Sequence, residues 1–182
     1  MLVPTRFDTG FDEKFNSYVI EVIKYQKSWH ICDLDGKREF NENIDPRFSD
    51  TGMILTSFGR NQNPNVNLHN ANLNIIADII LQVSLKSQTR YKFKNINLRR
   101  VIWNYYNKSS TGTFHRDLYE PNHCSLIYYL NTCDAFTIID DKQYDCIAGQ
   151  GVLFDSNIVH RGTGPTKSTY KYACNIVFDY EL

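Results

Sequence analysis

The sequence predicts a mainly β protein in which two helices flank an antiparallel sheet structure. Three observations favour this class. Hydrophobic residues recur at helical spacing in two segments of the first half, they alternate with polar residues from Arg90 onward, and turn residues separate the short alternating pieces. Helices followed by a run of strands are typical of a closed or sandwich-like sheet with helices packed on one side.

Two segments with apolar residues near helical spacing each predict an amphipathic helix. The first spans residues 11–28 and the second spans about residues 72–87. Their apolar stripes consist of Phe15, Val19, Val22 and Ile23, and of Leu73, Ile76, Ile80 and Val83. Both tryptophans, Trp29 and Trp103, are expected in the core.

The region between the predicted helices is mostly polar. Residues 41–70 are rich in asparagine and contain two prolines, which predicts a loop region. Within it, TGMILTSFG (residues 51–59) is strand-like. Just before it, residues 29–40 predict a strand, a turn at Asp35 and Gly36, and more strand.

From Arg90 to the C-terminus the hydrophobic period is two, which predicts eight or nine short strands. The strand-like pieces are YKFKNINL, RRVIWNYY, TFHRD, CSLIYYLN, AFTIID, KQYDCIA, GVLFD, IVHRG and TYKYACNIVFDY. Turn residues lie between them, so antiparallel neighbours joined by short connections are expected.

Composition narrows the class of protein. A chain of 182 residues with 42% hydrophobic residues predicts one folded domain over residues 1–182 and excludes a disordered chain. Zero net charge argues against a general attraction to nucleic acid or membrane. No apolar run is long enough to cross a bilayer, and no signal peptide is recognised. Five cysteines without a CxxC pair predict reduced, mostly buried thiols of a cytoplasmic protein; the oligomeric state is not predicted.

One pattern predicts a metal site, and it consists of His115, Asp117 and His160. On a strand, His115 and Asp117 at positions i and i+2 point to the same face, and His160 follows Asp117 by 43 residues. Two imidazoles and one carboxylate leave coordination positions open, which suits a non-heme Fe(II) that binds a cosubstrate and O2. The alternative is a hydrogen-bonded pair and an ordinary buried histidine. His30, His69 and His123 lack this spacing and are expected at the surface or as capping residues.

The residues around this pattern resemble the 2-oxoglutarate- and Fe(II)-dependent oxygenases, on the prolyl-4-hydroxylase-like side. The resemblance covers roughly residues 99–180. It consists of four motifs in the same order: RVIWNYYNKSSTGTFHRD, SLIYYLN, GQGVLFDSNIVHRG and KYACNIVFDY. It implies a double-stranded β-helix (jelly-roll or cupin-like) core in residues 99–182, with residues 1–98 as helical and irregular support.

The resemblance also implies an activity. Fe(II) would be held by the catalytic residues His115, Asp117 and His160, with 2-oxoglutarate and O2 as cosubstrates. The implied reaction is hydroxylation of a C–H bond, with succinate and CO2 as coproducts. A prolyl or other side chain of a peptide or protein is the first substrate class to expect, and a small molecule is the second.

Four further residues are implied to bind the cosubstrate. Lys171, eleven residues after His160, would pair with the distal carboxylate of 2-oxoglutarate, and Lys167 is the competing candidate. A hydrogen bond between charged groups contributes about 1.5–3 kcal/mol. Tyr129 would touch the same carboxylate through its hydroxyl group. Asn104 or Tyr105 would line the pocket.

A basic segment lies ahead of the metal pattern, because no acidic residue falls between Asp78 and Asp117. Its basic residues are Lys86, Arg90, Lys92, Lys94, Arg99, Arg100, Lys108 and Arg116. Such a segment could bind nucleic acid and serve oxidation of a nucleobase. A solvated outer face in a neutral chain is the favoured alternative. A third hypothesis is a non-catalytic jelly-roll module for binding or structure.

Overall fold

The computed structural model describes residues 2–26, 30–33, 51–59, 71–108 and 110–181. Two helices and ten strands are present in this part of the chain. In order they are β1 (Thr5–Asp8), α1 (Glu13–Lys24), β2 (His30–Asp33), β3 (Thr51–Gly59), α2 (Ala71–Ser87), β4 (Lys94–Asn107), β5 (His123–Tyr129), β6 (Phe136–Ile139), β7 (Lys142–Asp145), β8 (Gln150–Asp155), β9 (His160–Gly162) and β10 (Tyr170–Glu181). The predictions for residues 34–50 and 60–70, including His69, and for Trp29 lie outside the described residues, as do the side chains of His30 and Cys32.

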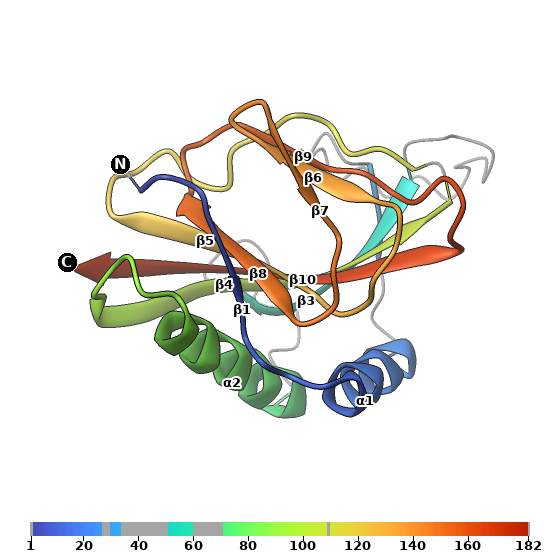
Figure 1. Cartoon of the computed structure of the whole chain (residues 1–182), viewed down its shortest axis with the longest axis horizontal. Helices are drawn as coiled ribbons and strands as arrows, with labels where there is room; N and C mark the ends of the chain where they lie inside the picture. Colours follow the sequence, from blue (N-terminus) through green and yellow to red (C-terminus); the bar gives the residue numbers. More distant parts are fainter. Residues whose placement is uncertain (1, 27–29, 34–50, 60–70, 109, 182) are drawn as a thin grey trace.

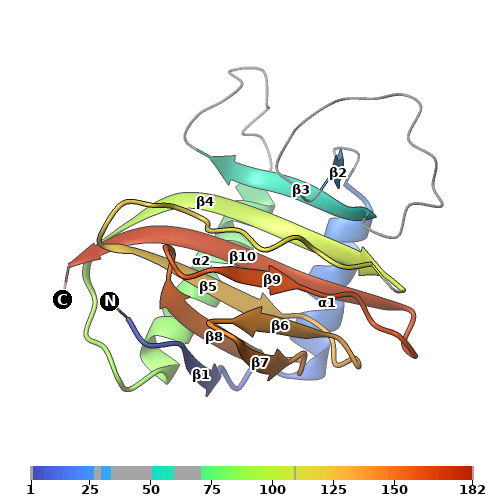
Figure 2. The same ribbon diagram turned by 90° about the horizontal axis from the view of Figure 1, so that it is seen from above.

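The strands form two antiparallel sheets that face each other. The main sheet has the strand order β1-β8-β5-β10-β4-β3-β2, and the minor sheet has the order β7-β6-β9. Both helices pack on the outer face of the main sheet, and the minor sheet covers its inner face (Figure 1). Figure 2 shows the same three layers from above. The predicted antiparallel β structure with helices on one side is confirmed.

The helices form because each has one apolar face to bury. The Asp12 side chain caps α1 by accepting a hydrogen bond from the Phe15 amide at 2.8 Å. Val19 and Ile23 of α1 are fully buried, as are Leu73 and Ile80 of α2. They pack on the helix-facing side of the main sheet, so both predicted helices are confirmed, although α1 ends at Lys24. Neither helix among the described residues is long and apolar enough to cross a lipid bilayer.

Strand β4 joins two of the predicted strand pieces. It begins at Lys94, so residues 90–93 are not a strand, although Tyr91 and Phe93 still pack against the core. From Arg100 onward the side chains alternate, and Val101 and Trp103 point toward the helices. Trp103 is fully buried, as predicted, and its Nε1 donates to Ser57 Oγ at 3.0 Å.

The first half of the chain contributes more strand than predicted. Strand β1, which the sequence analysis missed, pairs with β8, and β2 and β3 extend the opposite end of the main sheet. A second cluster of buried residues fills the space between the two sheets. Its fully buried members are Tyr129, Ile139, Cys146, Val152 and Phe154. Four cysteines in the described part of the chain are free thiols, and Cys124, Cys146 and Cys174 are buried, as expected.

Candidate active site

His115, Asp117 and His160 lie together on the side of the main sheet that faces the minor sheet; His160 is buried, whereas His115 is exposed. Each offers one ligand atom, and these atoms all lie within 4.8 Å of one another. His160 comes from β9, whereas His115 and Asp117 come from the segment between β4 and β5. The two imidazole ring centres are 4.4 Å apart.

The backbone brings these residues together in a way that strand alternation did not predict. The segment TFHRD is not a regular strand, so that prediction is wrong. Instead His115 and His160 form an isolated antiparallel bridge, with N···O distances of 3.0 Å and 2.9 Å. The Asp117 amide donates to the Ser156 carbonyl at 3.0 Å. Two residues of the pattern are therefore anchored to the segment that carries the third.

In both histidines the Nδ1 atom makes a hydrogen bond with a backbone carbonyl oxygen. Nδ1 of His115 lies 2.9 Å from the Thr113 carbonyl oxygen, and Nδ1 of His160 lies 3.0 Å from that of Ile158. A carbonyl oxygen only accepts, so Nδ1 is the donor and Nε2 keeps a free lone pair. Burial lowers the pKa of His160 below 6.5, which favours the neutral ring that a metal ligand requires.

Asp117 is a buried carboxylate held by several donors. Ser125 Oγ donates to Oδ2 at 2.6 Å, and Asn175 Nδ2 lies 3.3 Å from each carboxylate oxygen. The Arg100 guanidinium contacts Oδ1. Burial alone would raise the pKa of Asp117, but Arg100, His160 and Ser125 outweigh it and hold the pKa well below the usual range. Asp117 is therefore ionised and fixed in orientation.

These groups suit a divalent metal ion. His160 Nε2 is buried, has no hydrogen-bond partner among the described residues, and lies 3.5 Å from Asp117 Oδ2. A buried lone pair left unpaired beside a carboxylate is costly unless a cation lies between them. Two imidazole nitrogens and one carboxylate with open positions fit non-heme Fe(II).

Lys171 lies in the same space between the sheets, with only 1% of its surface exposed. Its Nζ donates to the carbonyl oxygens of Phe136 at 3.1 Å and Thr163 at 3.3 Å, and to Thr137 Oγ1 at 3.4 Å. No acidic side chain of the described residues pairs with it, and burial lowers its pKa below 10.5. A buried ammonium group without a counterion favours binding of an anion. Lys167, in contrast, is exposed.

Two buried tyrosines flank the Lys171 ammonium group. Nζ lies 5.1 Å from the ring centre of Tyr106 and 5.5 Å from that of Tyr129. The Tyr129 hydroxyl donates to Thr137 Oγ1 at 2.9 Å. Burial raises the pKa of Tyr106 to about 12 and also raises that of Tyr129, so both phenols remain protonated donors at neutral pH.

Lys171 and the histidine–aspartate group border the same face of β10. Asn175, which contacts Asp117, follows Lys171 by four residues, so both side chains point the same way about 13 Å apart along the strand. Asn104 lies on β4 with the inward-facing Arg100 and Tyr106. Tyr105 lies on the opposite face, where its ring packs 5.1 Å from that of Tyr172.

Sequence reasoning missed several residues of this site. Arg100 and Tyr106 share the alternation of Asn104, and Asn175 shares that of Lys171, so strand period could have placed them on the same faces, although not in contact with Asp117. Ser125 carried no such signal, because its contact with Asp117 depends on how the segment before β5 folds. His123, expected at the surface, is buried with Nε2 2.8 Å from Asp179 Oδ1.

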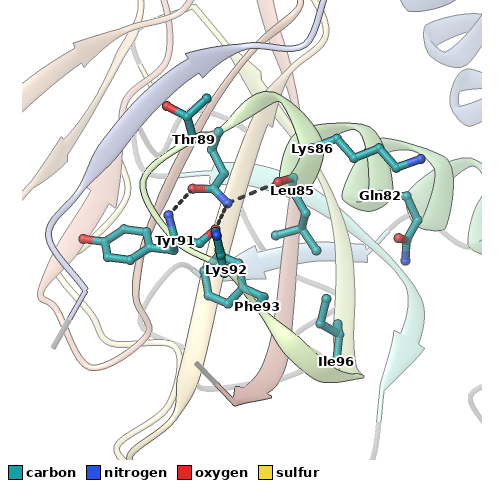
Figure 3. Close-up of a pocket in the computed structure, with 9 residues that line it drawn as sticks. Gln82, Leu85, Lys86, Thr89, Tyr91, Lys92, Phe93 and Ile96 are labelled. Atoms are coloured by element: carbon teal, nitrogen blue, oxygen red, sulfur yellow. Dashed lines mark hydrogen bonds between the residues drawn. The ribbon is translucent and has the colours of Figure 1, made fainter.

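A separate pocket lies in the basic segment (Figure 3). It has a volume of about 490 Å³ and lies where α2 ends and the chain turns toward β4. The Gln88 amide, inside the turn, hydrogen-bonds the backbone of Leu85, Arg90 and Tyr91. The lining includes Lys86 and Lys92 but no histidine, cysteine or acidic residue. The pocket lies beside α2 on the outer side of the main sheet, whereas the histidine–aspartate group lies on the inner side.

Comparison with known proteins finds no matching family model and no matching curated protein. Solved structures do match. A prolyl-4-hydroxylase from Pseudomonas putida superposes with a TM-score of 0.58 at 11% identity, over 98% of this chain and 92% of that protein. The viral collagen prolyl hydroxylase vCPH from Paramecium Bursaria Chlorella virus-1 gives 0.54 at 12% identity, over 97% and 96%. The epimerase SnoN of nogalamycin biosynthesis gives 0.66 at 8% identity, over 97% and 78%.

This is the fold of the 2-oxoglutarate- and Fe(II)-dependent oxygenases. The predicted double-stranded β-helix and the resemblance to the prolyl-hydroxylase-like branch are therefore confirmed at the level of the fold. The vCPH structure is a complex with 2-oxoglutarate, and another SnoN structure contains Fe3+ and α-ketoglutarate. Those ligands belong to the neighbours, and the low sequence identities limit the likeness to architecture.

Proposed function

We propose that this chain is an Fe(II)- and 2-oxoglutarate-dependent dioxygenase that hydroxylates a C–H bond. The observation that carries the proposal is the cluster of His115, Asp117 and His160, whose ligand atoms lie within 4.8 Å of one another and whose imidazoles both have Nδ1 next to a backbone carbonyl oxygen. A decayed jelly roll would not need to keep a buried, unpaired Nε2 atom on His160 beside an ionised Asp117.

His115, Asp117 and His160 would bind Fe(II), and neighbouring groups would keep these three side chains in orientation. Fe(II) in this site would supply the oxidation, using O2 and 2-oxoglutarate and releasing succinate and CO2. The carbonyls of Thr113 and Ile158 fix both imidazole tautomers, while Ser125 and Asn175 fix the Asp117 carboxylate.

Lys171 and Tyr129 would bind the distal carboxylate of 2-oxoglutarate. Support comes from the burial of the Lys171 ammonium group without an acidic partner among the described residues, and from the Tyr129 hydroxyl within the same cluster. Lysine offers a point charge rather than a planar fork, so neighbouring hydroxyl donors would complete the recognition. Asn104 and Tyr106 are the candidates for lining the cavity, since both lie on the inward face of β4.

A prolyl or other side chain of a peptide, or a small molecule, is the proposed substrate class. One structural neighbour, a prolyl hydroxylase from Trichoplax adhaerens, was solved with a peptide fragment of an oxygen degradation domain. Oxidation of a nucleobase is less favoured, because the pocket in the basic segment lies on the other side of the main sheet from the proposed metal ligands.

Succinate release from 2-oxoglutarate tests the proposal. We expect the purified protein to release succinate slowly when Fe(II), ascorbate and O2 are present, even without an added substrate. His160→Ala should abolish both this release and stoichiometric binding of Mn(II), because it removes one of three protein ligands. His123→Asn is the matched control, since His123 lies outside the group. Retention of Mn(II) by His160→Ala would exclude this metal site.

A further inference from the structure

Arg100 lies beside the proposed metal ligands but is not itself one of them. Its side chain is 31% exposed, and its Nη2 contacts Asp117 Oδ1. Its Nε atom is buried and has no hydrogen-bond partner among the described residues. A guanidinium carries five N–H donors in a planar fork. Arg100 therefore has donors to spare at the inner face of the main sheet.

Asp117 has donors other than Arg100 that orient its carboxylate. Ser125 Oγ already donates to Oδ2 at 2.6 Å, and Asn175 Nδ2 lies within 3.3 Å of both oxygens. The Asn175 amide oxygen is itself buried without a donor among the described residues. Two residues that contact the Asp117 carboxylate thus each have an unpaired buried polar atom, as expected of groups that bind a further molecule.

The charges of the site indicate the sign of the charge on that further molecule. This step rests on the proposed function. With Fe(II) and 2-oxoglutarate bound, the charges of the metal, the cosubstrate, Asp117 and Lys171 cancel, because an imidazole that ligates a metal is neutral. Arg100 pairs with Asp117, but Asp117 is already counted in this sum, so the loaded site with Arg100 carries one net positive charge. A metal ion that draws on Asp117 would also weaken the contact between Arg100 and Asp117.

We propose that Arg100 binds a carboxylate of the substrate and so selects acidic substrates. The planar guanidinium matches the two oxygens of a carboxylate, and one negative charge completes the neutralisation of the site. A phosphate monoester would bring about −1.5 to −2 charges, more than Arg100 alone compensates. Lys171 lies at a different position, farther along β10 from the proposed metal ligands. In this proposal Lys171 binds 2-oxoglutarate and Arg100 binds the substrate carboxylate.

Matched pairs of ligands test this inference. The probes are N-acetyl amino acids and the corresponding N-acetyl amino acid amides, which differ only in the carboxylate. Calorimetric titrations use the protein loaded with Mn(II) and N-oxalylglycine, an inert analogue of 2-oxoglutarate. We expect the best acid to bind about tenfold or more tightly than its amide, as for a hydrogen bond between charged groups. Equal or absent binding of acid and amide across the panel would overturn the inference.

Substitutions then assign the preference to this residue. Arg100→Gln should remove the preference for the acid and Arg100→Lys should keep part of it, when each variant is titrated at saturating Mn(II). Arg99→Gln is the matched control, because the neighbouring Arg99 pairs with Asp179. If Arg100→Gln weakens Mn(II) binding and leaves the preference for the acid intact, Arg100 positions Asp117 and the inference is wrong.

The two proposals fail in different experiments. A wild-type protein that releases no succinate contradicts the proposed function, whatever Arg100 binds. A protein that releases succinate but does not prefer acids contradicts only the role of Arg100. Acids that raise succinate release above the rate without substrate, in wild type and Arg99→Gln but not in Arg100→Gln, would support both.

Discussion

Asp117 owes its fixed orientation to neighbours that the proposed metal would not replace. Ser125 donates to Oδ2 at 2.6 Å. We expect Ser125→Ala to weaken Mn(II) binding about 10- to 100-fold, since removing a group that orients a ligand has this effect in metal sites. Fluorescence-detected titration with Mn(II) measures it. Cys124→Ser, next in sequence and buried on the other face of β5, is the control. Unchanged affinity in Ser125→Ala would mean that Asn175 suffices.

The buried Lys171 should make the free energy of unfolding depend on pH. Burial lowers its pKa below 10.5, because a buried ammonium group loses hydration. At pH values below this lowered pKa, the folded protein carries the full cost of the buried charge. Between the lowered pKa and 10.5 the folded chain gives up its proton before the unfolded chain does, so this cost falls as the pH rises.

We therefore expect Lys171→Met to bind 2-oxoglutarate at least tenfold more weakly, yet to be as stable as wild type or more stable near about pH 7. Its advantage in melting temperature should shrink as the pH approaches 10.5. Melting curves across this range test the expectation, with the exposed Lys167→Met as control. An advantage that grows with pH would show that the charge is not the cause.

Helix α2 contains a polar atom that its position does not explain. Ser84 is fully buried, and its Oγ has no hydrogen-bond partner among the described residues. Ser84→Ala removes an unsatisfied hydroxyl group and improves helix propensity, so we expect it to raise the free energy of unfolding by about 1 kcal/mol. Urea denaturation measures this change. Ser87→Ala, at the partly exposed end of the helix, is the control. A destabilised Ser84→Ala would point to a cavity or a lost partner instead.

Helices α1 and α2 were predicted from their apolar stripes, because burial of one helix face imposes a period on the sequence. Strands β3, β5, β8 and β10 were predicted as short strand-like pieces bounded by turn residues. Strand β1 was missed because four residues are too few to display a period. The segment with His115 and Asp117 was predicted as a strand, but it is held by isolated backbone hydrogen bonds to Ser156 and His160, which lie far away in the chain.

The candidate site was predictable only in part. Spacing and resemblance brought out His115, Asp117, His160, Lys171 and Tyr129, and these residues do lie on the inner side of the main sheet. The residues that orient them did not stand out, since a serine or an asparagine gains its role only when distant strands become neighbours. Ser125 on β5 and Asn175 on β10, for example, meet at Asp117.

At the scale of the whole molecule, metal binding should stabilise the fold. The three proposed ligands converge only in the folded chain, so Mn(II) at 100 times its dissociation constant should add about 2.7 kcal/mol to the free energy of unfolding. A thermal melt with and without Mn(II) tests this expectation. His160→Ala should show no shift, and EDTA should reverse the shift of the wild type. A shift that survives in His160→Ala would mean that Mn(II) binds elsewhere.

The bridge between His115 and His160 couples assembly of the candidate metal site to the pairing of β9 in the minor sheet. The two residues are 45 positions apart, yet each amide donates to the other's carbonyl, while β9 also pairs with β6. Any opening of β9 would therefore separate the two imidazoles before the main sheet is disturbed. Hydrogen exchange at these two amides would report how often β9 opens. A bound metal ion would link the two imidazoles and slow this opening.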